Sequence, residues 1–317
     1  MFAPVVRLRT WVLVQLGLWR RQWRRCRIEV PGARSYFGQL AVRAWRYGLY
    51  TPAGLADDES APLVVVLHGC RQRALGFAHA AGWTGFADRA RLRLLCPDQR
   101  RLANMLRCWN WFHSSAQRGQ GELDVIIAMI DDAAGRVRVN TNAVAVVGMS
   151  AGGALAALLA FHHPDRFRAV VAVASPPLLG SLSVQNPHDV MRRGLAFGPT
   201  LALGASRQAC APLVVVHGTE DKVVHPRCAG QLVEQALGSI RRAGMQAQSG
   251  NTASASAGTT ITDYLAEGKL WLRSIEVQGL GHAWTGGPGG HPYCEQRGAP
   301  LTALCARFLR DVGMLRS

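Results

Sequence analysis

The chain has 317 residues, of which 49% are hydrophobic and 18% are charged, so it can bury a large core and is not a disordered protein. A chain of this length is commonly one domain in α/β folds, and one domain is expected here. The formal net charge of +16 favours anionic surroundings such as nucleic acid, acidic polymer or anionic lipid.

Residues 1–30 are predicted to form a basic extension rich in Trp and Arg, and residues 31–317 the folded domain. The apolar stretch from Trp11 to Trp19 is too short to span a bilayer as a helix. It resembles the apolar part of a signal peptide, but Arg20 and Arg21 follow where small cleavage-site residues are expected. The alternatives are a helix lying on a membrane surface and a poorly ordered basic extension.

Short apolar runs alternate with longer helical patterns after this extension. The alternation predicts an α/β fold with a mostly parallel central sheet and helices on both faces. The expected buried strands are Leu63–Leu67, Leu92–Cys96, Ala143–Val147, Ala169–Ala174, Leu213–Val216 and Leu272–Val277. Apolar spacing predicts the helices Glu122–Val137, Ala151–His162, Gly230–Arg242 and Leu301–Leu309.

Three further segments are less regular. Arg27–Val30 and Arg43–Tyr50 are candidates for antiparallel strands at the sheet edge. The segment Gln246–Thr260 is small, polar and rich in Ala, Ser and Thr, and is therefore predicted to be a flexible surface loop.

The chain contains eight cysteines without any C-x-x-C pair. Zinc-ligand spacing is absent, so no structural metal is expected. An even number of cysteines permits disulfides and an oxidising compartment, but it equally permits buried free thiols.

The candidate nucleophile is Ser150 in Gly148-Met149-Ser150-Ala151-Gly152. With 34 Gly and 15 Ser in the chain, chance alone predicts on the order of 0.2 G-x-S-x-G patterns. The context is more specific, because the pattern joins a predicted strand to a predicted helix, as a nucleophile elbow requires. The structural alternative is a serine that caps the helix.

A catalytic serine on this type of fold is followed in the chain by an acid and then by a histidine. Asp221 is the candidate acid, because it follows the strand Leu213–Val216 and the turn that begins at Gly218. Glu220 is expected to face solvent. Asp165 and Asp189 are weaker alternatives, and Asp165 is expected to cap a turn.

His282 is the candidate base, because it follows the last buried strand and precedes a glycine-rich loop at residues 286–290. The competing histidines are His225, which is only four residues from Asp221, and His291, which lies deep in the loop. An oxyanion hole needs two backbone N–H groups. Ala151, directly after the nucleophile, supplies one candidate; Cys70, after an early strand, supplies the other, with Arg71 as its nearest alternative.

Five motifs in order resemble the polyhydroxybutyrate depolymerase and feruloyl esterase family, over roughly Ala41 to Leu309. They are Leu67-His68-Gly69-Cys70-Arg71-Gln72, Cys108-Trp109-Asn110-Trp111-Phe112, Gly148-Met149-Ser150-Ala151-Gly152-Gly153, His217-Gly218-Thr219-Glu220-Asp221 and Gly279-Leu280-Gly281-His282-Ala283-Trp284-Thr285-Gly286-Gly287. The resemblance implies an α/β-hydrolase that cleaves carboxylic esters without a cofactor or metal. It implies Ser150, Asp221 and His282 as the triad and Cys70 in the oxyanion hole.

The resemblance also suggests substrate contacts at Trp109, Trp111 and Trp284, although a Trp in an apolar segment is equally expected in the core. It places Cys70 and Cys108 near each other, as a candidate disulfide. Polymer-degrading members of the family carry an added substrate-binding domain after a linker. Since no such segment follows here, hydroxyalkanoate oligomers or small soluble esters are the expected substrates.

The expected function is therefore that of a serine carboxylic-ester hydrolase. Its alternatives are an acyltransferase or peptidase that uses the same triad, and a non-catalytic protein that binds polyanions on this fold. No specific nucleic-acid motif is present, and membrane-surface contact is expected only through the basic N-terminus. The resemblance implies a secreted or periplasmic protein, with a cytoplasmic or membrane-associated one as the alternative.

Overall fold

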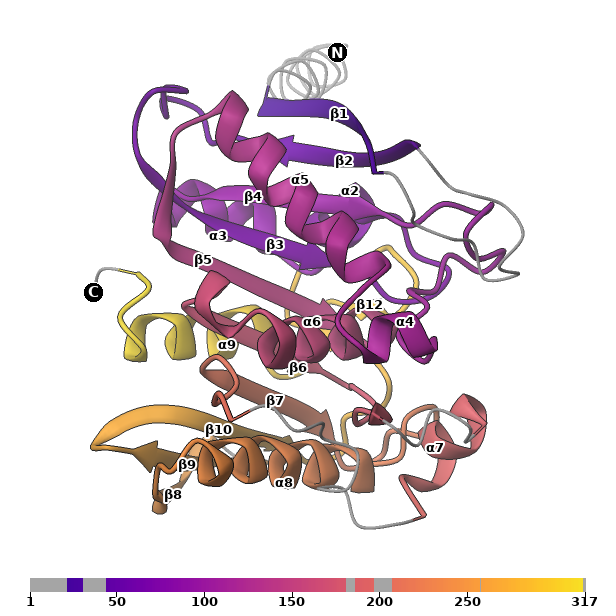
Figure 1. Cartoon of the computed structure of the whole chain (residues 1–317), viewed down its shortest axis with the longest axis vertical. Coiled ribbons are helices and arrows are strands. Elements are labelled where there is room, and N and C mark those ends of the chain that lie inside the picture. Colours follow the sequence, from indigo (N-terminus) through magenta and orange to yellow (C-terminus); the bar gives the residue numbers. More distant parts are fainter. Residues whose placement is uncertain (1–21, 31–43, 181–185, 197–206, 257, 316–317) are drawn as a thin grey trace, which may run out of the picture.

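The chain folds around one large sheet, as a computed structural model of the protein shows (Figure 1). The structure describes residues 22–30, 44–180, 186–196, 207–256 and 258–315. Within these ranges ten strands form the sheet in the order β1-β2-β4-β3-β5-β6-β7-β10-β9-β8. The strands are β1 Trp23–Glu29, β2 Ala44–Tyr50, β3 Ala61–Leu67, β4 Arg93–Asp98, β5 Val139–Met149, β6 Ala169–Val173, β7 Leu213–Gly218, β8 Ala247–Ser256, β9 Thr259–Ala266 and β10 Lys269–Val277.

The centre of the sheet is parallel and its two margins are antiparallel. Strands β4, β3, β5, β6, β7 and β10 pair in parallel, whereas β1 and β2 on one side and β9 and β8 on the other pair antiparallel. The six expected buried strands are all present. The predicted α/β-hydrolase type of fold is confirmed, and its parallel strands direct their carboxyl ends to one edge of the sheet.

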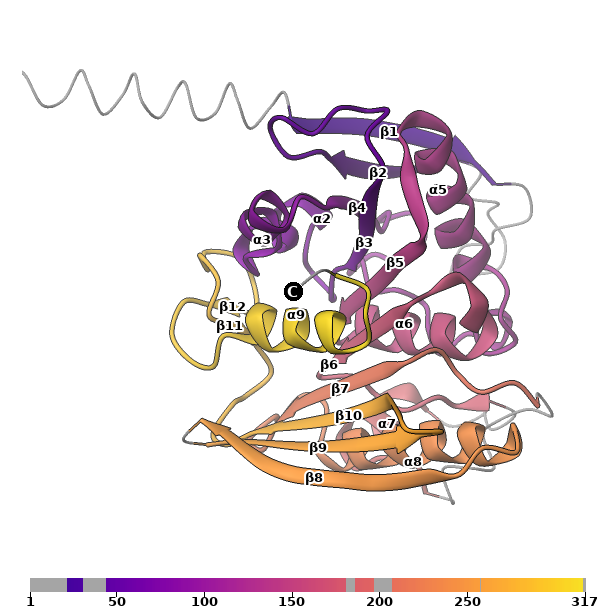
Figure 2. The same cartoon turned by 90° about the vertical axis from the view of Figure 1, so that its left-hand side faces the viewer.

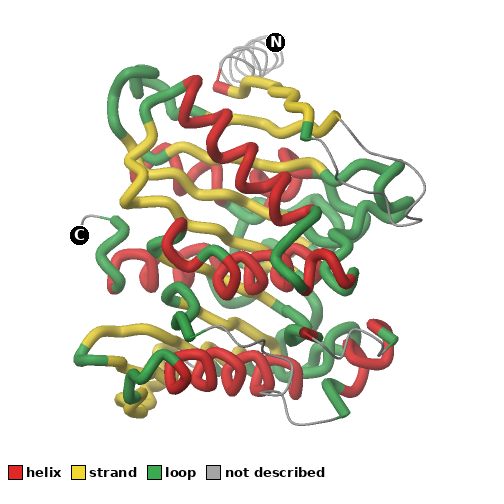
Figure 3. The backbone as a smooth tube through the Cα atoms, viewed as in Figure 1, coloured by secondary structure: helices red, strands yellow, loops and turns green. Residues whose placement is uncertain are grey.

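Helices cover both faces of this sheet (Figures 2 and 3). The helices α5, α6 and α8 lie on one face, and α2, α3 and α9 lie on the other. Their bounds, with those of the short helices and the small second sheet, are α2 Ala74–Ala80, α3 Trp83–Ala90, α4 Ser114–Gln117, α5 Glu122–Arg136, α6 Ala151–His162, η1 Pro164–Arg166, α7 Pro187–Arg193, α8 Arg227–Arg242, α9 Leu301–Asp311, β11 Trp284–Thr285 and β12 Cys294–Glu295. No helix in the described part of the chain combines the length and apolar character needed to cross a bilayer.

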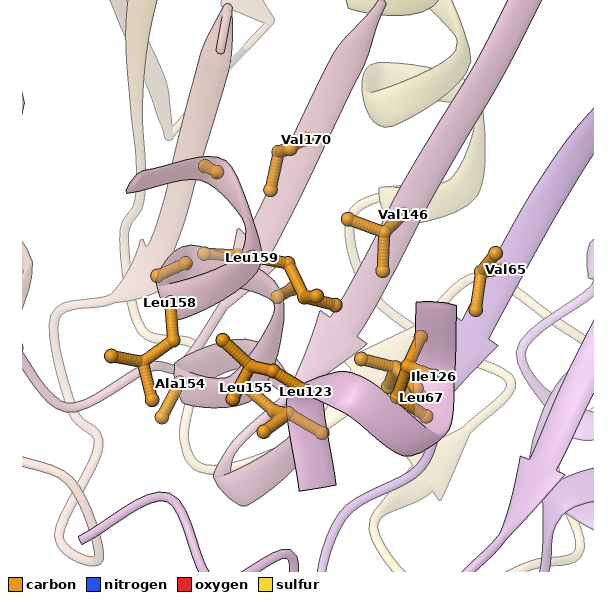
Figure 4. Close-up of a cluster of buried hydrophobic side chains, with 14 of the residues drawn as sticks. Val65, Leu67, Leu123, Ile126, Val146, Ala154, Leu155, Leu158, Leu159 and Val170 are labelled. Atoms are coloured by element: carbon orange, nitrogen blue, oxygen red, sulfur yellow. The ribbon is translucent and has the colours of Figure 1, made fainter. Parts of the chain in front are cut away.

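The core consists of two main layers, because successive residues of a strand point to opposite faces. In β3, Val65 and Leu67 pack into the layer under α5 and α6, while Val64 and Val66 pack into the layer under α2, α3 and α9. Figure 4 shows the first layer, where side chains of the sheet meet those of α5 and α6. The parallel strands are therefore buried on both faces, which explains their nearly uninterrupted apolar sequence.

The candidate edge strands near Arg27–Val30 and Arg43–Tyr50 are present as the antiparallel pair β1 and β2. The structure departs from two other expectations about the margins. Residues 23–29 of the predicted extension form the edge strand β1, whose Trp23 ring lies 4.9 Å from the ring of Tyr50. The rest of the extension, residues 1–21, lies outside the described residues. The predicted loop at 246–260 contains instead the strand β8, because backbone hydrogen bonds to β9 do not require large apolar side chains at an edge of the sheet.

Candidate active site

Ser150 lies at the sharp turn between β5 and α6. Its backbone has φ 57° and ψ −121°, a conformation that is strained for a residue with a side chain. The Ser150 N–H donates to the Val173 carbonyl at 2.9 Å, which fixes the turn to the neighbouring strand β6. The residue is 7% exposed, so the surrounding chain encloses this serine almost completely.

Glycines make this turn sterically feasible. A Cβ on Gly148 would lie 2.0 Å from the Gly152 carbonyl oxygen, and a Cβ on Gly152 would lie 2.3 Å from the Leu67 carbonyl oxygen. Since neither distance is compatible with a side chain, strand β5, helix α6 and the end of β3 approach each other closely only with glycine at both positions.

Asp221 and His282 are hydrogen-bonded to each other. The His282 Nδ1 lies 2.7 Å from the Asp221 Oδ2, and the Asp221 Oδ1 accepts from the N–H groups of Val223 and Val224 at 2.9 and 2.8 Å. Burial alone would raise the pKa of Asp221, but the hydrogen bond and the charge of His282 outweigh burial and hold the pKa below its usual value. An ionised Asp221 favours the Nδ1–H tautomer of His282 and leaves Nε2 available as a base.

The loops that carry the acid and the histidine are joined by their backbones. A Cβ on Gly218 would lie 2.0 Å from the Leu280 carbonyl oxygen, so only glycine fits there. The Glu220 N–H donates to the same Leu280 oxygen at 3.0 Å, and the Gly279 N–H donates to the Thr219 hydroxyl at 2.9 Å. These contacts hold Asp221 and His282 in register.

His217 is a neighbour of Asp221 to which the sequence analysis gave no role. Its Nε2 lies 3.5 Å from the Asp221 Oδ2 and 2.8 Å from the Val224 carbonyl oxygen. Burial lowers the pKa of this histidine, so the neutral ring donates its Nε2–H to Val224 and places a polar edge beside the acid. Its position directly before Gly218, as the first residue of the motif His217-Gly218-Thr219-Glu220-Asp221, is the sequence signal that could have identified it.

The alternative acids and bases lie elsewhere. Glu220, Asp165 and Asp189 are all exposed, and Asp165 accepts hydrogen bonds from Gln208. His225 accepts from the Arg227 N–H at 3.1 Å, and His291 accepts from the Arg73 N–H at 3.1 Å. None of these groups makes a hydrogen bond to another candidate member of the triad within the described residues.

The loop after β3 lies against the serine. A Cβ on Gly69 would lie 3.4 Å from the Ser150 Cβ. The Arg71 N–H donates to the Leu106 carbonyl at 2.7 Å and is therefore engaged, whereas the N–H groups of Cys70 and Ala151 make no hydrogen bond to the described part of the chain. Cys70 forms a disulfide with Cys108, the pairing that the family resemblance suggested.

Gln72 is a second residue to which the sequence analysis assigned no role. Its fully buried side chain accepts the Gly69 N–H on Oε1 at 2.7 Å and donates from Nε2 to the Pro292 carbonyl. One side chain therefore connects the loop beside Ser150 with the segment after His282. That segment also carries Tyr293, whose ring packs edge-on against the His282 ring at 5.6 Å.

A buried polar network supports the loop from behind. His68 accepts the Gln99 N–H on Nε2 at 3.1 Å and faces the Gly69 carbonyl with Nδ1 at 2.7 Å; burial lowers its pKa to about 4, so the ring is neutral. Glu122 accepts hydrogen bonds from Gln99 and from the backbone and side chain of Asn110. Burial raises the pKa of Glu122 to about 7 despite these three donors.

The three tryptophans that were candidates for substrate contact are buried. Trp109 and Trp111 belong to the core layer under α5 and α6. Trp284 belongs to the opposite layer, where it packs against Phe77 and Trp83. Their exposed fractions of 0 to 3% favour the core-packing interpretation over substrate contact.

A separate cavity between two helices offers no comparable nucleophile. This cavity of about 870 Å³ between α3 and α9 is lined by Thr84, Phe86, Thr302 and neighbours, and its lining contains neither Ser150 nor any other serine or cysteine. Within the described ranges, no three His, Cys, Asp or Glu side chains gather in a group that could hold a metal ion.

Comparison with known proteins gives a consistent result. The model of the family described as "Esterase PHB depolymerase" matches residues 45–261. A poly(3-hydroxyalkanoate) depolymerase C of Paucimonas lemoignei is 30% identical over 59% of this chain and 46% of its own length. A poly(3-hydroxybutyrate) depolymerase of Ralstonia pickettii is 29% identical over 72% and 49%. The chain thus spans about half the length of these two relatives.

Solved structures show the same fold at low sequence identity. An acetyl xylan esterase from Aspergillus awamori superposes with a TM-score of 0.64 at 16% identity, covering 82% of this chain and 94% of that one. The LpqC poly(3-hydroxybutyrate) depolymerase from Bordetella parapertussis has a TM-score of 0.54 at 17% identity, covering 85% and 88%.

Proposed function

Since the chain belongs to the esterase PHB depolymerase family, we propose that it hydrolyses carboxylic esters with a triad of Ser150, His282 and Asp221. The observation that carries the proposal is the 2.7 Å hydrogen bond between His282 and the buried Asp221. Both residues lie on loops that follow parallel strands of the central sheet, and the strained turn at Ser150 follows another strand of the same sheet. A strained serine followed by a hydrogen-bonded acid–histidine pair is the arrangement that serine esterases use.

In the acylation step, the His282 Nε2 removes the Ser150 hydroxyl proton as the oxygen attacks the ester carbonyl carbon. Asp221 keeps the imidazole in the required tautomer and stabilises its positive charge. The tetrahedral intermediate collapses when His282 donates the proton to the leaving alcohol, which yields an acyl-enzyme and free alcohol.

In the deacylation step, water attacks the acyl carbon while His282 removes its proton. The second intermediate then releases the acid and restores the Ser150 hydroxyl. In both steps the N–H groups of Cys70 and Ala151 bind the negative oxygen, and such a donor typically lowers a barrier by about 3 kcal/mol. Gln72 and the Cys70–Cys108 disulfide support this role because both constrain the loop that contains Cys70.

The proposed substrates are hydroxyalkanoate oligomers or small soluble esters. The names of the two depolymerase relatives support hydroxyalkanoates as one class. The disulfide supports a secreted or periplasmic location, because disulfides persist mainly in oxidising compartments.

The test is turnover of p-nitrophenyl esters of increasing acyl length and of hydroxybutyrate oligomers by Ser150→Ala. We expect kcat to fall by at least about 10⁴-fold and labelling by a fluorophosphonate probe to disappear. The matched control is Ser249→Ala, at an exposed serine on β8, which should keep both properties. Full turnover by Ser150→Ala would refute the assignment. Adding a competing alcohol would separate hydrolysis from acyl transfer.

A further inference from the structure

Five large hydrophobic side chains are conspicuously exposed in the described part of the chain. They have exposed fractions between 39% and 76%, and they are Leu102, Met105, Leu106, Val223 and Tyr293. All five belong to loops that contact the candidate active site. A soluble protein normally scatters such residues over its surface, so their concentration at one site indicates an interaction surface.

Three contacts establish the positions of these loops. The Leu106 carbonyl accepts the Arg71 N–H at 2.7 Å, which attaches the segment of Leu102, Met105 and Leu106 to the loop beside Ser150. The Val223 N–H donates to the Asp221 carboxylate at 2.9 Å. The Tyr293 ring packs against the His282 ring. Each member of the candidate triad therefore has an exposed apolar residue on an adjoining loop.

These loops also lie at one edge of the molecule. Strands β3, β5 and β7 direct their carboxyl ends to the same side, which is the right-hand side of Figure 1. The segment with Tyr293 is held to the loop after β3 by two contacts, from Gln72 to Pro292 and from Arg73 to His291. The exposed apolar residues consequently form parts of one surface around the site.

Four cationic side chains without a carboxylate partner lie on the same or adjoining loops as the exposed apolar residues. Arg71, Arg73, Arg101 and Lys222 are exposed, and no ion pair joins them to a carboxylate of the described residues. Some exposed arginines elsewhere have partners, as Arg24 has in Asp57 and Arg91 in Glu59, whereas others, such as Arg241 and Arg242, form no ion pair within the described residues. What distinguishes the four cations is therefore their place beside the exposed apolar residues. The exposed carboxylates on the same loops are Glu220 and Glu295. We call these four cations and the five apolar residues the rim.

We propose that the rim docks the protein on an anionic lipid surface, with the candidate active site facing that surface. The inference rests on the proposed function and restricts its esters to those with apolar acyl chains that partition into such a surface, in place of freely soluble ones. Apolar side chains enter the acyl boundary, while arginine and lysine remain at the level of the phosphates. Tyr293 combines an apolar ring with a polar tip, as residues at membrane interfaces do.

The charge of the rim favours an anionic lipid surface over two other partners, a second copy of the chain and an uncharged polyester surface. Two copies of a chain with a net charge of +16 repel each other, so a dimer through these faces is disfavoured. An uncharged polyester surface would contact the apolar residues but would leave the four cations without partners. A negatively charged lipid surface uses both sets of side chains.

The direct test places a fluorescent label on the rim. The free cysteines of the described residues are all buried and Cys70 is paired with Cys108, so Met105→Cys introduces an exposed thiol that can be labelled selectively. With vesicles of phosphatidylglycerol we expect a blue shift of an environment-sensitive dye, and with vesicles of phosphatidylcholine we expect none. The control label at Arg241→Cys, on the exposed end of α8, should not shift. Equal shifts at both labels, or in both kinds of vesicle, would overturn the proposal.

Substitutions separate the rim from the basic residues 1–21, which lie outside the described residues. We expect Leu102→Ser/Met105→Ser/Leu106→Ser and Arg71→Gln/Arg73→Gln/Arg101→Gln each to weaken binding to phosphatidylglycerol vesicles at least tenfold, with folding checked by thermal unfolding. Arg241→Gln/Arg242→Gln removes charge outside the rim and should change binding less than twofold. Equal weakening by all three variants would refute the proposal that the rim docks on anionic lipid. Binding to a neutral polyester film that matches binding to the anionic vesicles would refute it as well.

Two readouts keep this proposal distinct from the proposed function. Docking is measured with Ser150→Ala, which needs no catalysis, and turnover is measured with a monomeric p-nitrophenyl ester, which needs no surface. Turnover without selective docking would overturn the inference and leave the esterase assignment standing. Selective docking without turnover by the native chain would overturn the esterase assignment and leave the docking inference standing. A dimer in solution that the triple serine variant dissociates would also refute lipid docking.

Discussion

The two halves of the candidate site are constrained by different means. The nucleophile side, residues 67–72 and 148–153, is held by close backbone packing that only glycine permits, and by the Cys70–Cys108 disulfide. The acid–base side, residues 217–224 and 279–284, has one such contact, between Gly218 and the Leu280 carbonyl, and is otherwise held by hydrogen bonds between two loops. Close packing therefore dominates the positioning of the serine, whereas hydrogen bonds contribute more to the positioning of the histidine. Mutations on the nucleophile side should therefore mainly lower stability, whereas a mutation of the acid should mainly lower kcat.

The largest expected effect concerns the acid–base side. Asp221→Asn retains the shape of the side chain but removes the charge that selects the His282 tautomer, so kcat should fall by about 10⁴-fold. Since the backbone contacts between the loops remain, the melting temperature should stay within a few degrees of the native value. Ester kinetics and thermal unfolding on one preparation test both statements. An Asp221→Asn enzyme with near-native kcat would remove the aspartate from the triad.

The disulfide on the nucleophile side should contribute to stability. Cys70 and Cys108 close a loop with a sequence separation of 38 residues, and replacing both with serine should lower the unfolding free energy by about 4 kcal/mol. Denaturant unfolding with and without reductant measures this loss. The reduced native chain should match the double variant, because both lack the same cross-link. Identical unfolding midpoints in all samples would show that the disulfide does not constrain the loop.

A matched pair of glycine substitutions tests the steric constraint. Gly152→Ala forces a Cβ against the Leu67 and His68 carbonyls and should cost about 3 kcal/mol or more. Gly230→Ala, in α8, meets no atom within 4 Å and should instead stabilise the protein by about 0.5–1 kcal/mol, because alanine favours helix. Both values come from denaturant unfolding. Equal effects of the two substitutions would show that the elbow is not sterically limited.

The smallest expected effect is a pH dependence behind the nucleophile side. Burial raises the pKa of Glu122 from an ordinary value near 4.5 to about 7, so between these values the folded state binds more protons than the unfolded state. Stability from this group should therefore fall as the pH rises from about 4.5 to 7, on the order of 2 kcal/mol in all. Because the amide of Glu122→Gln does not titrate, the unfolding free energy of the native chain should fall relative to that of the variant as the pH rises across this range. Parallel curves would contradict the assignment.

The predictable parts of this molecule are those encoded locally. The strands β3, β5, β6 and β7 were evident because burial on both faces demands continuous apolar runs. The order of Ser150, Asp221 and His282 indicated candidate chemistry because each residue follows a predicted strand. Both signals are contained in short segments of the sequence.

The remaining features depend on contacts between distant segments. The hydrogen bond from Gln72 to Pro292 joins residues 220 positions apart, and the packing of Tyr293 on His282 has no sequence pattern. Strand β8 looks like a linker because Ala, Ser and Thr dominate it, yet β9 supplies its backbone partners. The alternatives at Trp109 were left open because an indole in an apolar segment is compatible with either a core or a substrate contact.

Strand β8 also has a consequence for how the protein behaves in concentrated solution. It is the last strand of the sheet, so one row of its backbone N–H and C=O groups has no neighbouring strand among the described residues. Such an edge can recruit a strand from another molecule and start aggregation. The segment Ala247–Ser256 is rich in Ala and contains Gly250 and Asn251, residue types that are depleted in strands, so it lacks the high β-propensity of segments that form steric zippers. The composition that made this segment look like a loop in the sequence therefore also disfavours edge-to-edge aggregation of the folded protein through β8.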